Sequence, residues 1–310
     1  MQLSVGLVVP LLFVAGLLLS RIHFCMVAAV ARARLGDWDT ARAIGLISLG
    51  VSLVLLVLAL ATGSLPRQLP ADWRILAGGL LFGFTAAWNR GCFVGTSIQL
   101  AGGDLRALIS MVGWVLGFVL VGSPMAPVAL SGQLERITAS AALILLLLLC
   151  LAWRSVRSAG ARPPERQPVH WRISIVCGGL LALVDHDQWP WDPSALARAL
   201  AHPLNLAASW HRHDLSALLA LVLLAGMAAE ALRQRRLQLV LPRGADLVRL
   251  GFGIGMAVGA ALAMGGNDSQ LLRFLPAGSP HGWIAVPAML LGILGGLHTP
   301  SPAALFRLKP

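Results

Sequence analysis

The sequence predicts an all-α polytopic membrane protein. Of its 310 residues, 57% are hydrophobic and only 12% are charged, and its mean hydropathy is +0.78. Soluble globular domains carry about a quarter charged residues. Apolar runs of about 20 residues, the length that crosses a bilayer as a helix, recur along the chain. Together these observations exclude a soluble globular domain.

About nine apolar stretches are candidates for spanning helices. They lie at 3–31, 43–62, 75–90, 105–122, 137–153, 173–184, 214–232, 246–264 and 282–299. The first is long and is interrupted by Arg21 and His23, and the third and sixth are short. No positively charged segment precedes the first stretch and no small-residue cleavage site follows it. We therefore expect a retained membrane segment rather than a signal peptide.

The distribution of arginine predicts the topology. The net charge of +11 comes from arginine, since Lys309 is the one lysine, and arginines are dense at 154–172 and 233–249. Cytoplasmic loops collect basic residues, so we expect both segments inside and 185–213 outside. The N-terminus is then periplasmic and the C-terminus cytoplasmic, in a bacterial inner membrane. The outer-side residues Arg67, Arg74 and Arg136 count against this assignment. No long basic face lies outside the membrane, so we expect no nucleic-acid partner.

The basic linker 154–172 divides the chain into two halves, 1–153 and 173–310. Each half ends in a glycine-bearing helix, a polar break, a loop with small residues and a further helix. The topology places the two breaks near opposite sides of the membrane, as in an inverted repeat. Glycine-interrupted segments at matching places in two halves indicate a transporter binding site at their interface. Shared glycine richness alone is the alternative explanation.

The polar break Asn89-Arg90-Gly91-Cys92 is the first candidate site. Broken backbone at membrane depth is tolerated only where it is buried in protein or lines a cavity. Unpaired N–H groups at such a break favour anions, and a neighbouring cation makes a thiol more reactive. The alternative is a packing Gly-Cys pair with Arg90 reaching the lipid headgroups.

Two further polar segments interrupt apolar runs. Arg21, His23 and Cys25 lie within the first stretch, where ionisable residues are functional candidates by default. The alternative is that Arg21 snorkels and that Cys25 is a small apolar filler. The second segment is Gly265-Gly266-Asn267-Asp268, which either binds a substrate or caps two half-helices.

The sequence offers little support for a metal site or another cofactor. The four cysteines, at 25, 92, 150 and 177, show no CxxC spacing, and we expect Cys150 and Cys177 to be packing residues. Aspartate and histidine are dense in the outer segment, at 185–187, 202 and 211–214. Such residues bind divalent metals, but their spacing matches no helix-borne motif. We predict neither a metal site nor a cofactor.

These segments resemble the YeeE/YedE family of membrane proteins, which includes thiosulfate transporters. The resemblance spans most of the chain and is most specific at Gly91-Cys92 with the later Gly102-Gly103-Asp104-Leu105-Arg106. The supporting motifs are Arg21-Ile22-His23-Phe24-Cys25, Gly36-Asp37-Trp38, Gly78-Gly79, Gly265-Gly266-Asn267-Asp268 and His281-Gly282-Trp283.

The resemblance implies nine spanning helices, short helices that enter the membrane partway, and an internal pseudo-two-fold. It also implies a narrow path along which cysteine thiols pass a sulfur-bearing anion by transient S–H···S contacts. Cys25 and Cys92 match two of these thiols. The third family thiol follows a glycine in the last break, where this chain has Gly265-Gly266. Asn267 and Asp268 could supply a polar contact instead, although an ionised Asp268 would repel an anion.

The expected function is therefore transport of thiosulfate or a related sulfur anion across the bilayer, without covalent chemistry. The expected path residues are Arg21, His23, Cys25, Asn89, Arg90, Gly91, Cys92, Gly266, Asn267 and Asp268. A cytoplasmic sulfur-carrier protein is a candidate partner. Two alternatives remain at this point: a sulfur-transfer protein with a persulfide on Cys92, and an accessory membrane subunit that transports nothing.

Overall fold

The computed structural model describes residues 4–63, 71–121, 133–157, 171–186, 191–201 and 213–300. The long helices are α1 (Val5–Ile22), α3 (Asp39–Thr62), α4 (Trp73–Asn89), α6 (Arg106–Val121), α7 (Gln133–Arg157), α8 (Trp171–His186), α10 (His213–Arg233), α11 (Val248–Leu262) and α13 (Pro280–His298). The short helical segments are α2 (Met26–Ala33), α5 (Phe93–Ala101), α9 (Pro193–Ala201), the 3-10 turn η4 (Gly244–Leu247) and α12 (Asn267–Ser269), which continues into the π-helical turn η5 (Gln270–Phe274).

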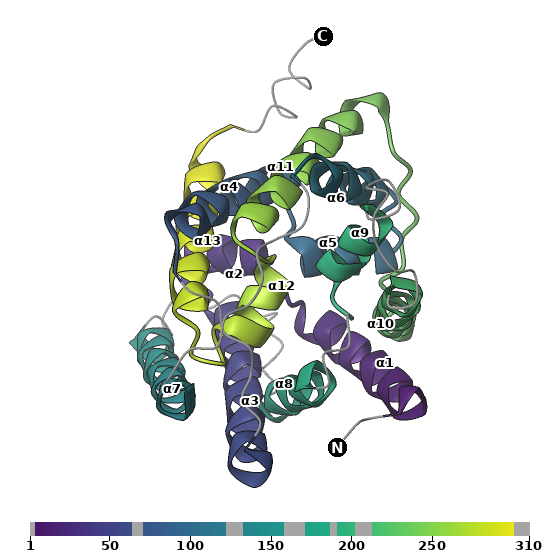
Figure 1. Ribbon diagram of the computed structural model, residues 1–310. Helices are drawn as coiled ribbons and strands as arrows, with labels where there is room; N and C mark the ends of the chain where they lie inside the picture. The colour runs from purple at the N-terminus through teal and green to yellow at the C-terminus, as the bar shows by residue number, and fades with distance from the viewer. Residues whose placement is uncertain are drawn as a thin grey trace.

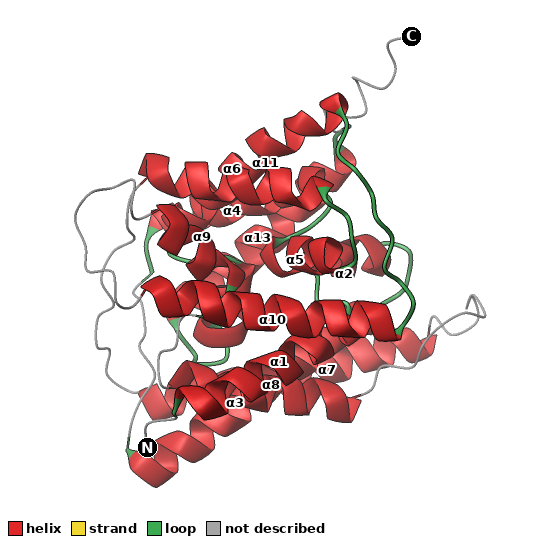
Figure 2. Cartoon of the chain, turned by 90° about the vertical axis from the view of Figure 1, so that its right-hand side faces the viewer, coloured by secondary structure: helices red, strands yellow, loops and turns green. Residues whose placement is uncertain are grey.

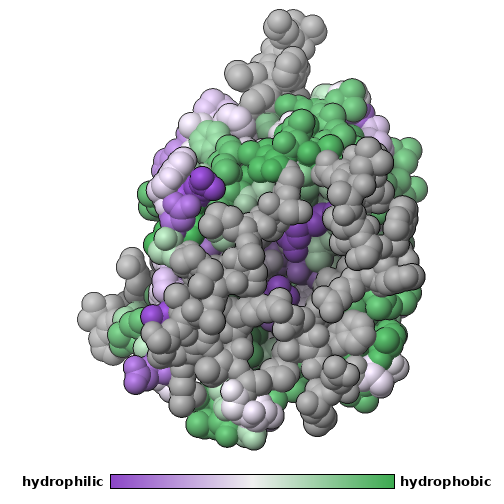
Figure 3. Space-filling model, viewed as in Figure 1, coloured by the Kyte–Doolittle hydropathy of each residue, from purple (hydrophilic) through white to green (hydrophobic). Residues whose placement is uncertain are grey.

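The long helices surround the short ones. Figure 1 shows α2, α5, α9 and α12 in the middle of the molecule, with α7 at its edge. In the view turned by 90°, α6, α10 and other long helices run across the picture in roughly one direction (Figure 2). On the face shown in Figure 3, hydrophobic residues show at the top and along the sides, while hydrophilic residues show near the centre and at the upper left. This distribution suits a protein with lipid around its flanks.

Five helical segments are long and apolar enough to cross a membrane, among the residues described. They are Val5–Ala33, Asp39–Thr62, Glu135–Ala152, Gly244–Leu262 and Pro280–His298. The predicted all-α membrane class is therefore confirmed for this part of the chain. The count of nine spans stays a prediction, because α4, α6 and α8 are each shorter than 18 residues.

The apolar stretch 3–31 is not one continuous helix. α1 ends at Ile22, His23 adopts a left-handed conformation with φ 55°, and α2 begins at Met26. The Phe24 N–H returns to the Leu19 carbonyl at 3.1 Å, which closes the last turn of α1. The interruption at Arg21–Cys25 is thus a true helix break, and Cys25 caps the helix that follows.

Glycines allow four pairs of long helices to touch backbone to backbone. α1 packs on α10, α3 on α8, α4 on α13 and α6 on α11. A Cβ at Gly16 of α1 would lie 2.1 Å from the Leu223 oxygen of α10, and one at Gly178 of α8 would lie 2.1 Å from the Ile47 oxygen of α3. Small residues at such contacts are typical of helix association in membranes.

The breaks after α4 and α11 have the same backbone geometry. Arg90 and Met264 are both left-handed, with φ 60° and 52°. Two residues later, Cys92 and Gly266 share φ −77° and ψ −178°, and each caps the next short helix. The two units also have the same spacing between helix starts, from Phe93 to Arg106 and from Asn267 to Pro280.

The turn after α5 is anchored to the segment after α10. Asp104 forms an isolated bridge with Val240, and a Cβ at Gly103 would lie 2.6 Å from the Gln238 oxygen. Arg106 donates two hydrogen bonds of 2.7 Å to the Asp104 carboxylate. Burial raises the pKa of Asp104, but the bonds from Arg106 outweigh burial and hold that pKa below its ordinary value. The Gly-Gly-x-Leu-Arg motif therefore fixes the end of α5.

Candidate functional site

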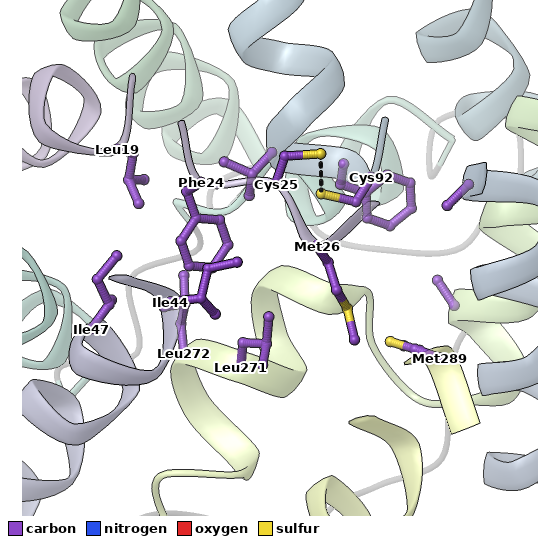
Figure 4. Packing of buried hydrophobic residues seen from close by; sticks show 14 of the residues in the cluster. Leu19, Phe24, Cys25, Met26, Ile44, Ile47, Cys92, Leu271, Leu272 and Met289 are labelled. Atoms are coloured by element: carbon purple, nitrogen blue, oxygen red, sulfur yellow. Dashed lines mark hydrogen bonds between the residues drawn. The ribbon is translucent and has the colours of Figure 1, made fainter. Parts of the chain in front are cut away.

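Two buried thiols meet at the breaks that start α2 and α5. The Cys92 Sγ lies 3.8 Å from the Cys25 Sγ, within reach of an S–H···S hydrogen bond. Both cysteines are free and buried. Figure 4 shows the two sulfurs facing each other across a dashed contact. The structure thus joins two predicted residues from separate helix breaks.

Each thiol lies at the start of two short helices. Cys92 is the N-cap of α5, and its sulfur accepts the Gly95 N–H at 3.4 Å. It also lies near the Met26 N–H, at the start of α2. Cys25 is the N-cap of α2 and lies near the N–H groups of Val27, Ala28 and Cys92. The positive ends of two helices, of eight and nine residues, therefore point at the pair.

Gly95 makes room for the thiol pair. A Cβ on this residue would lie 2.5 Å from the Cys25 Sγ and 3.5 Å from the Cys92 Sγ. Sequence reasoning did not select Gly95, although it stands three positions after Cys92, one turn into the helix. The sequence signal for Gly95 is its place as the third residue of a helix whose N-cap is a cysteine.

Asn89 holds the break in place. Its side-chain NH₂ donates to the Gly91 carbonyl at 3.1 Å and to the Thr96 hydroxyl at 3.0 Å. Its carbonyl oxygen accepts the Ser110 hydroxyl at 2.6 Å. Asn89 is fully buried, so these bonds satisfy polar groups that would otherwise lack water. A Cβ at Gly91 would lie 2.9 Å from the Thr96 hydroxyl, which explains the glycine beside it.

The predicted cations lie apart from the thiols. Arg90 caps α4, and its side chain is exposed. His23 is also exposed, and its Nε2 lies 2.6 Å from a guanidinium nitrogen of Arg236. Arg21 is half-buried in the last turn of α1. Arg90 and His23 are therefore not buried with the thiol pair.

The break after α11 contacts the break after α4 directly. The Phe93 N–H donates to the Asn267 side-chain oxygen at 3.2 Å, across the contact between α5 and α12. The side-chain nitrogen of Asn267 is buried and has no partner among the described residues. Because the backbone N–H can only donate, the oxygen of Asn267 must face it, and the NH₂ group is the free one. A free amide donor therefore lies beside the residue that follows Cys92.

Gly266 lies between Phe93 and Asp268. Its φ of −77° is open to any residue, so backbone strain does not explain the glycine. A Cβ at Gly266 would instead lie 2.3 Å from Cδ2 of the Phe93 ring and 2.6 Å from Oδ1 of Asp268. The ring of Phe93 thus fills the space beside the position at which the resemblance implies a third thiol.

A second polar centre, which the sequence analysis missed, lies on α9. Asp192 precedes the helix, accepts the Ala195 N–H and the Ser194 hydroxyl, and lies 3.5 Å from Arg198. The Ser194 N–H donates to Asp268 Oδ2 at 3.1 Å. Segment 185–213 was expected to be an outer connection, yet its residues 191–201 form a largely buried helix against α5, α6, α10 and α12. The signal was Asp192-Pro193-Ser194, an N-cap followed by proline at the first helical position.

Two thioethers continue from the thiol pair. Figure 4 shows the side chain of Met26 extending away from Cys25, in the buried cluster that also holds Cys92 and Met289. Both methionines are buried, and Met289 comes from α13. Thioether sulfur is polarizable and adapts its shape, so it suits a contact with a soft, sulfur-bearing group.

Among the acidic and histidine-rich candidates, Asp187, His202, His211 and Arg212 lie outside the described residues. Asp185 pairs with Arg273 of η5. In the described ranges no group of three or more metal-ligating residues is close enough to hold an ion. Cys177 is buried, with its sulfur 4.0 Å from the Ala15 oxygen, whereas Cys150 is exposed on α7.

Comparison with known proteins agrees with this architecture. A family model described as sulphur transport matches residues 21–294, which includes both thiols and the three helix breaks at Cys25, Cys92 and Gly266. A comparison with curated proteins finds no match to the chain. The matched family is a transporter family, and its match supports a sulfur anion as the substrate. Because the family model matches most of its length, the chain belongs to the sulphur transport family, the YeeE/YedE family of membrane proteins.

Proposed function

We propose that this protein carries thiosulfate, or a related sulfur anion, across the bacterial inner membrane along a path through the Cys25–Cys92 pair. The observation that carries the proposal is the pair itself: two free, buried thiols 3.8 Å apart. Their position at two helix N-termini, in a chain of the sulphur transport family, supplies the charge preference.

The thiols suit the sulfur end of such an anion. A thiol donates a weak hydrogen bond and presents a polarizable surface, so it can contact terminal sulfur without a covalent bond. Weak contacts also let the anion leave, as conduction requires. With Arg90 exposed at the end of α4, the anion is stabilised mainly by backbone dipoles rather than by a tight ion pair.

The oxygen atoms of the anion need N–H or O–H hydrogen-bond donors, and the break after α11 offers one. The free NH₂ group of Asn267 is fully buried next to the start of α5. A buried donor without a partner costs about 1–3 kcal/mol, so an incoming oxygen that accepts from it gains that free energy back. We assign Asn267 this role, in place of the third thiol that the resemblance implies at position 266.

The path then needs a substitute for the third sulfur. With Gly266 covered by Phe93, we assign the next sulfur contacts to Met26 and Met289, which lie in the same buried cluster as the two thiols. Thioethers accept contacts but donate no hydrogen bond. We expect a path with two thiols at its narrow point and two thioethers beside it.

We also propose that the chain is an inverted repeat in which α1–α6 correspond to α8–α13, with α7 as the connection. The pairing of α1 with α10 then matches that of α8 with α3, and the pairing of α4 with α13 matches that of α11 with α6. The equal geometry at Cys92 and Gly266 supports the same correspondence. On this scheme α4, α6, α8 and α10 also cross the bilayer, which gives nine spans with a periplasmic N-terminus and a cytoplasmic C-terminus.

Uptake into liposomes tests the transport proposal. Purified protein reconstituted in lipid vesicles should accumulate radiolabelled thiosulfate, and unlabelled thiosulfate should compete with it better than sulfate does. Cys25→Ala should abolish this uptake, whereas Cys177→Ala removes a buried thiol elsewhere and should leave it intact. Absence of uptake by well-folded wild-type protein would refute transport. A persistent sulfur adduct on Cys92, detected by mass, would instead favour sulfur transfer.

A further inference from the structure

A network of five ionisable side chains lies where α8, α9, α12 and η5 meet. Arg198 pairs with Asp192 at 3.5 Å, and Arg273 pairs with Asp185. Asp268 is the fifth member, and it has no guanidinium within ion-pair distance among the described residues. Its two oxygens accept backbone N–H groups instead, from Ser194 at 3.1 Å and from Ser269 at 2.9 Å.

Counted over the described residues, the network has one carboxylate more than it has cations. Its three aspartates face two arginines, and each arginine already has a carboxylate partner. Asp268 is 1% exposed and Asp192 is 3% exposed, so water does not solvate the surplus charge. An ionised carboxylate without a counter-charge is very unfavourable in such a place and is relieved when it binds a proton. Asp268, the unpaired member, is the group on which that proton belongs.

Asp268 also adjoins the anion path. A Cβ at Gly266 would touch both Oδ1 of Asp268 and the ring of Phe93, the residue next to Cys92. Since Asn267 bonds to the Phe93 N–H, the carboxylate belongs to the same short turn that faces the thiols. In a low-dielectric site, an ionised Asp268 beside the path repels an anion, whereas a neutral Asp268 does not.

We propose that Asp268 is a proton-binding site and that a proton on it accompanies each anion through the protein. This proposal rests on the proposed transport function. The proton comes from water on the side where the anion enters and binds a carboxylate oxygen, forming an O–H bond. When the anion has left on the other side, the O–H bond breaks and the proton follows it. Neutral Asp268 thus removes a repulsion at the moment when the anion passes.

Among the described residues, the charged groups that act on Asp268 are Asp192 before α9, Arg198 of α9 and Arg273 of η5. The neighbouring elements also carry Asp185 of α8, which pairs with Arg273, His281 of α13 and the thiols Cys25 and Cys92. Two of these carboxylates are neutralised by their arginines, and His281 lies 2.6 Å from the Ala263 oxygen rather than near the carboxylate. Asp268 remains the group whose charge is free to change.

Reconstituted full-length protein tests the proposal with two readouts. Thiosulfate uptake is measured at several external pH values, while a trapped pH-sensitive dye reports proton movement into the vesicles. We expect uptake by wild-type protein to acidify the lumen and to slow by up to about tenfold per pH unit once Asp268 is largely ionised. Asp268→Asn stays neutral at every pH but has one acceptor oxygen in place of two, so its pH dependence rather than its rate is compared with wild type. Its uptake should be independent of pH and should move no protons. Asp39→Asn, which changes an aspartate paired with Arg42 at the start of α3, should behave as wild type.

Infrared spectroscopy gives a readout that does not depend on transport. Wild-type protein without substrate should show a titrating band of a protonated carboxyl group, and Asp268→Asn should lack it. Asp268→Glu retains a carboxyl group and should restore the band if the asparagine variant folds poorly. Thiosulfate uptake without proton movement, or the same carboxyl band in wild type and Asp268→Asn, would overturn the proposal. Failure of wild type to take up thiosulfate while the band is present would refute the transport function and leave the proton site standing.

Discussion

Three interactions fix the position of Cys92. It caps α5, its sulfur accepts the Gly95 N–H, and its thiol reaches Cys25 at the start of α2. Serine is nearly isosteric, and it can still cap the helix, since serine is among the best N-cap residues. Helix formation and thiol chemistry at this position are therefore separable by one substitution.

Cys92→Ser should fold normally and lose most of its thiosulfate uptake. The expected loss is about tenfold or more, the factor that corresponds to about 1.4 kcal/mol of lost stabilisation along the path. The measurement is initial uptake in vesicles at equal protein content. Cys177→Ser is the matched control, because Cys177 is buried and free but contacts Ala15 of α1. Equal uptake by Cys92→Ser and wild type would show that the sulfur of Cys92 has no part in transport.

Gly95→Ala should displace the thiol of Cys25. The new methyl group would lie 2.5 Å from the Cys25 Sγ, so either the thiol or α5 must move. Forced packing of this kind costs about 1–3 kcal/mol, and we expect lower thermal stability together with at least tenfold slower uptake. Gly251→Ala in α11 is the control, since nothing lies within 4 Å of its Cβ. If Gly95→Ala matched this control in both measurements, the space beside the thiols would not be limiting.

Glycine contacts determine how the elements fit together. Gly50 of α3 and Gly178 of α8 face each other's helix, with ideal Cβ positions 2.4 Å from the Ile175 oxygen and 2.1 Å from the Ile47 oxygen. Gly16 of α1 and Gly226 of α10 make the equivalent contacts, both at 2.1 Å. In lipid there is little hydrophobic gain between helices, so close backbone packing carries more of the association.

Adjacent glycines in α8 allow a controlled test of this packing. Gly178→Ala places a methyl group on the backbone of α3, whereas Gly179→Ala meets only the Val54 side chain at 3.4 Å. Both changes gain about 0.5–1 kcal/mol of helix propensity. We expect Gly178→Ala to lower the melting temperature in detergent and Gly179→Ala to leave it unchanged or higher. The reverse order would mean that α3 and α8 are not in the contact described.

At the scale of the whole molecule, the proposed repeat fixes which connections share a side of the membrane. The turn after α2 and the segment after α10 both belong to the cytoplasmic side on this scheme, and the start of α4 belongs to the periplasmic side. Leu35, Leu239 and Trp73 are exposed residues at these three places. Each can therefore report a side without disturbing the core.

Single cysteines at these positions test the topology. In a Cys150→Ser background, which removes the exposed native thiol, an impermeant maleimide added to intact cells should label Trp73→Cys only. Leu35→Cys and Leu239→Cys should react only after the membrane is opened. Labelling of Leu239→Cys in intact cells would contradict the predicted orientation, and opposite behaviour of Leu35→Cys and Leu239→Cys would contradict the repeat itself.

Local patterns in the sequence are enough to predict the class of the protein and the extent of most of its long helices. The stretch 43–62 lies within α3, and 282–299 nearly coincides with α13. The class and the helix extents are both local properties. A run of about 20 apolar residues is enough to cross the hydrocarbon core, and glycine or polar residues are enough to end such a run. The same local signals marked the breaks at Cys25, Cys92 and Gly266, and the resemblance that they carry agrees with the family match.

Which of these breaks meet depends on how the helices pack and could not be predicted from local patterns. Cys25 and Cys92 are 67 positions apart in the chain, and no local pattern specifies that their sulfurs face each other. Arg90 and Cys92 are neighbours in sequence, yet the left-handed turn at Arg90 leaves its side chain exposed while Cys92 is buried. The contact of Ser194 with Asp268 likewise depends on how α9 packs against α12. Apolar runs and helix breaks depend on residues that are adjacent in the chain. The site depends on contacts between helices that are distant in the chain, and local patterns do not specify those contacts.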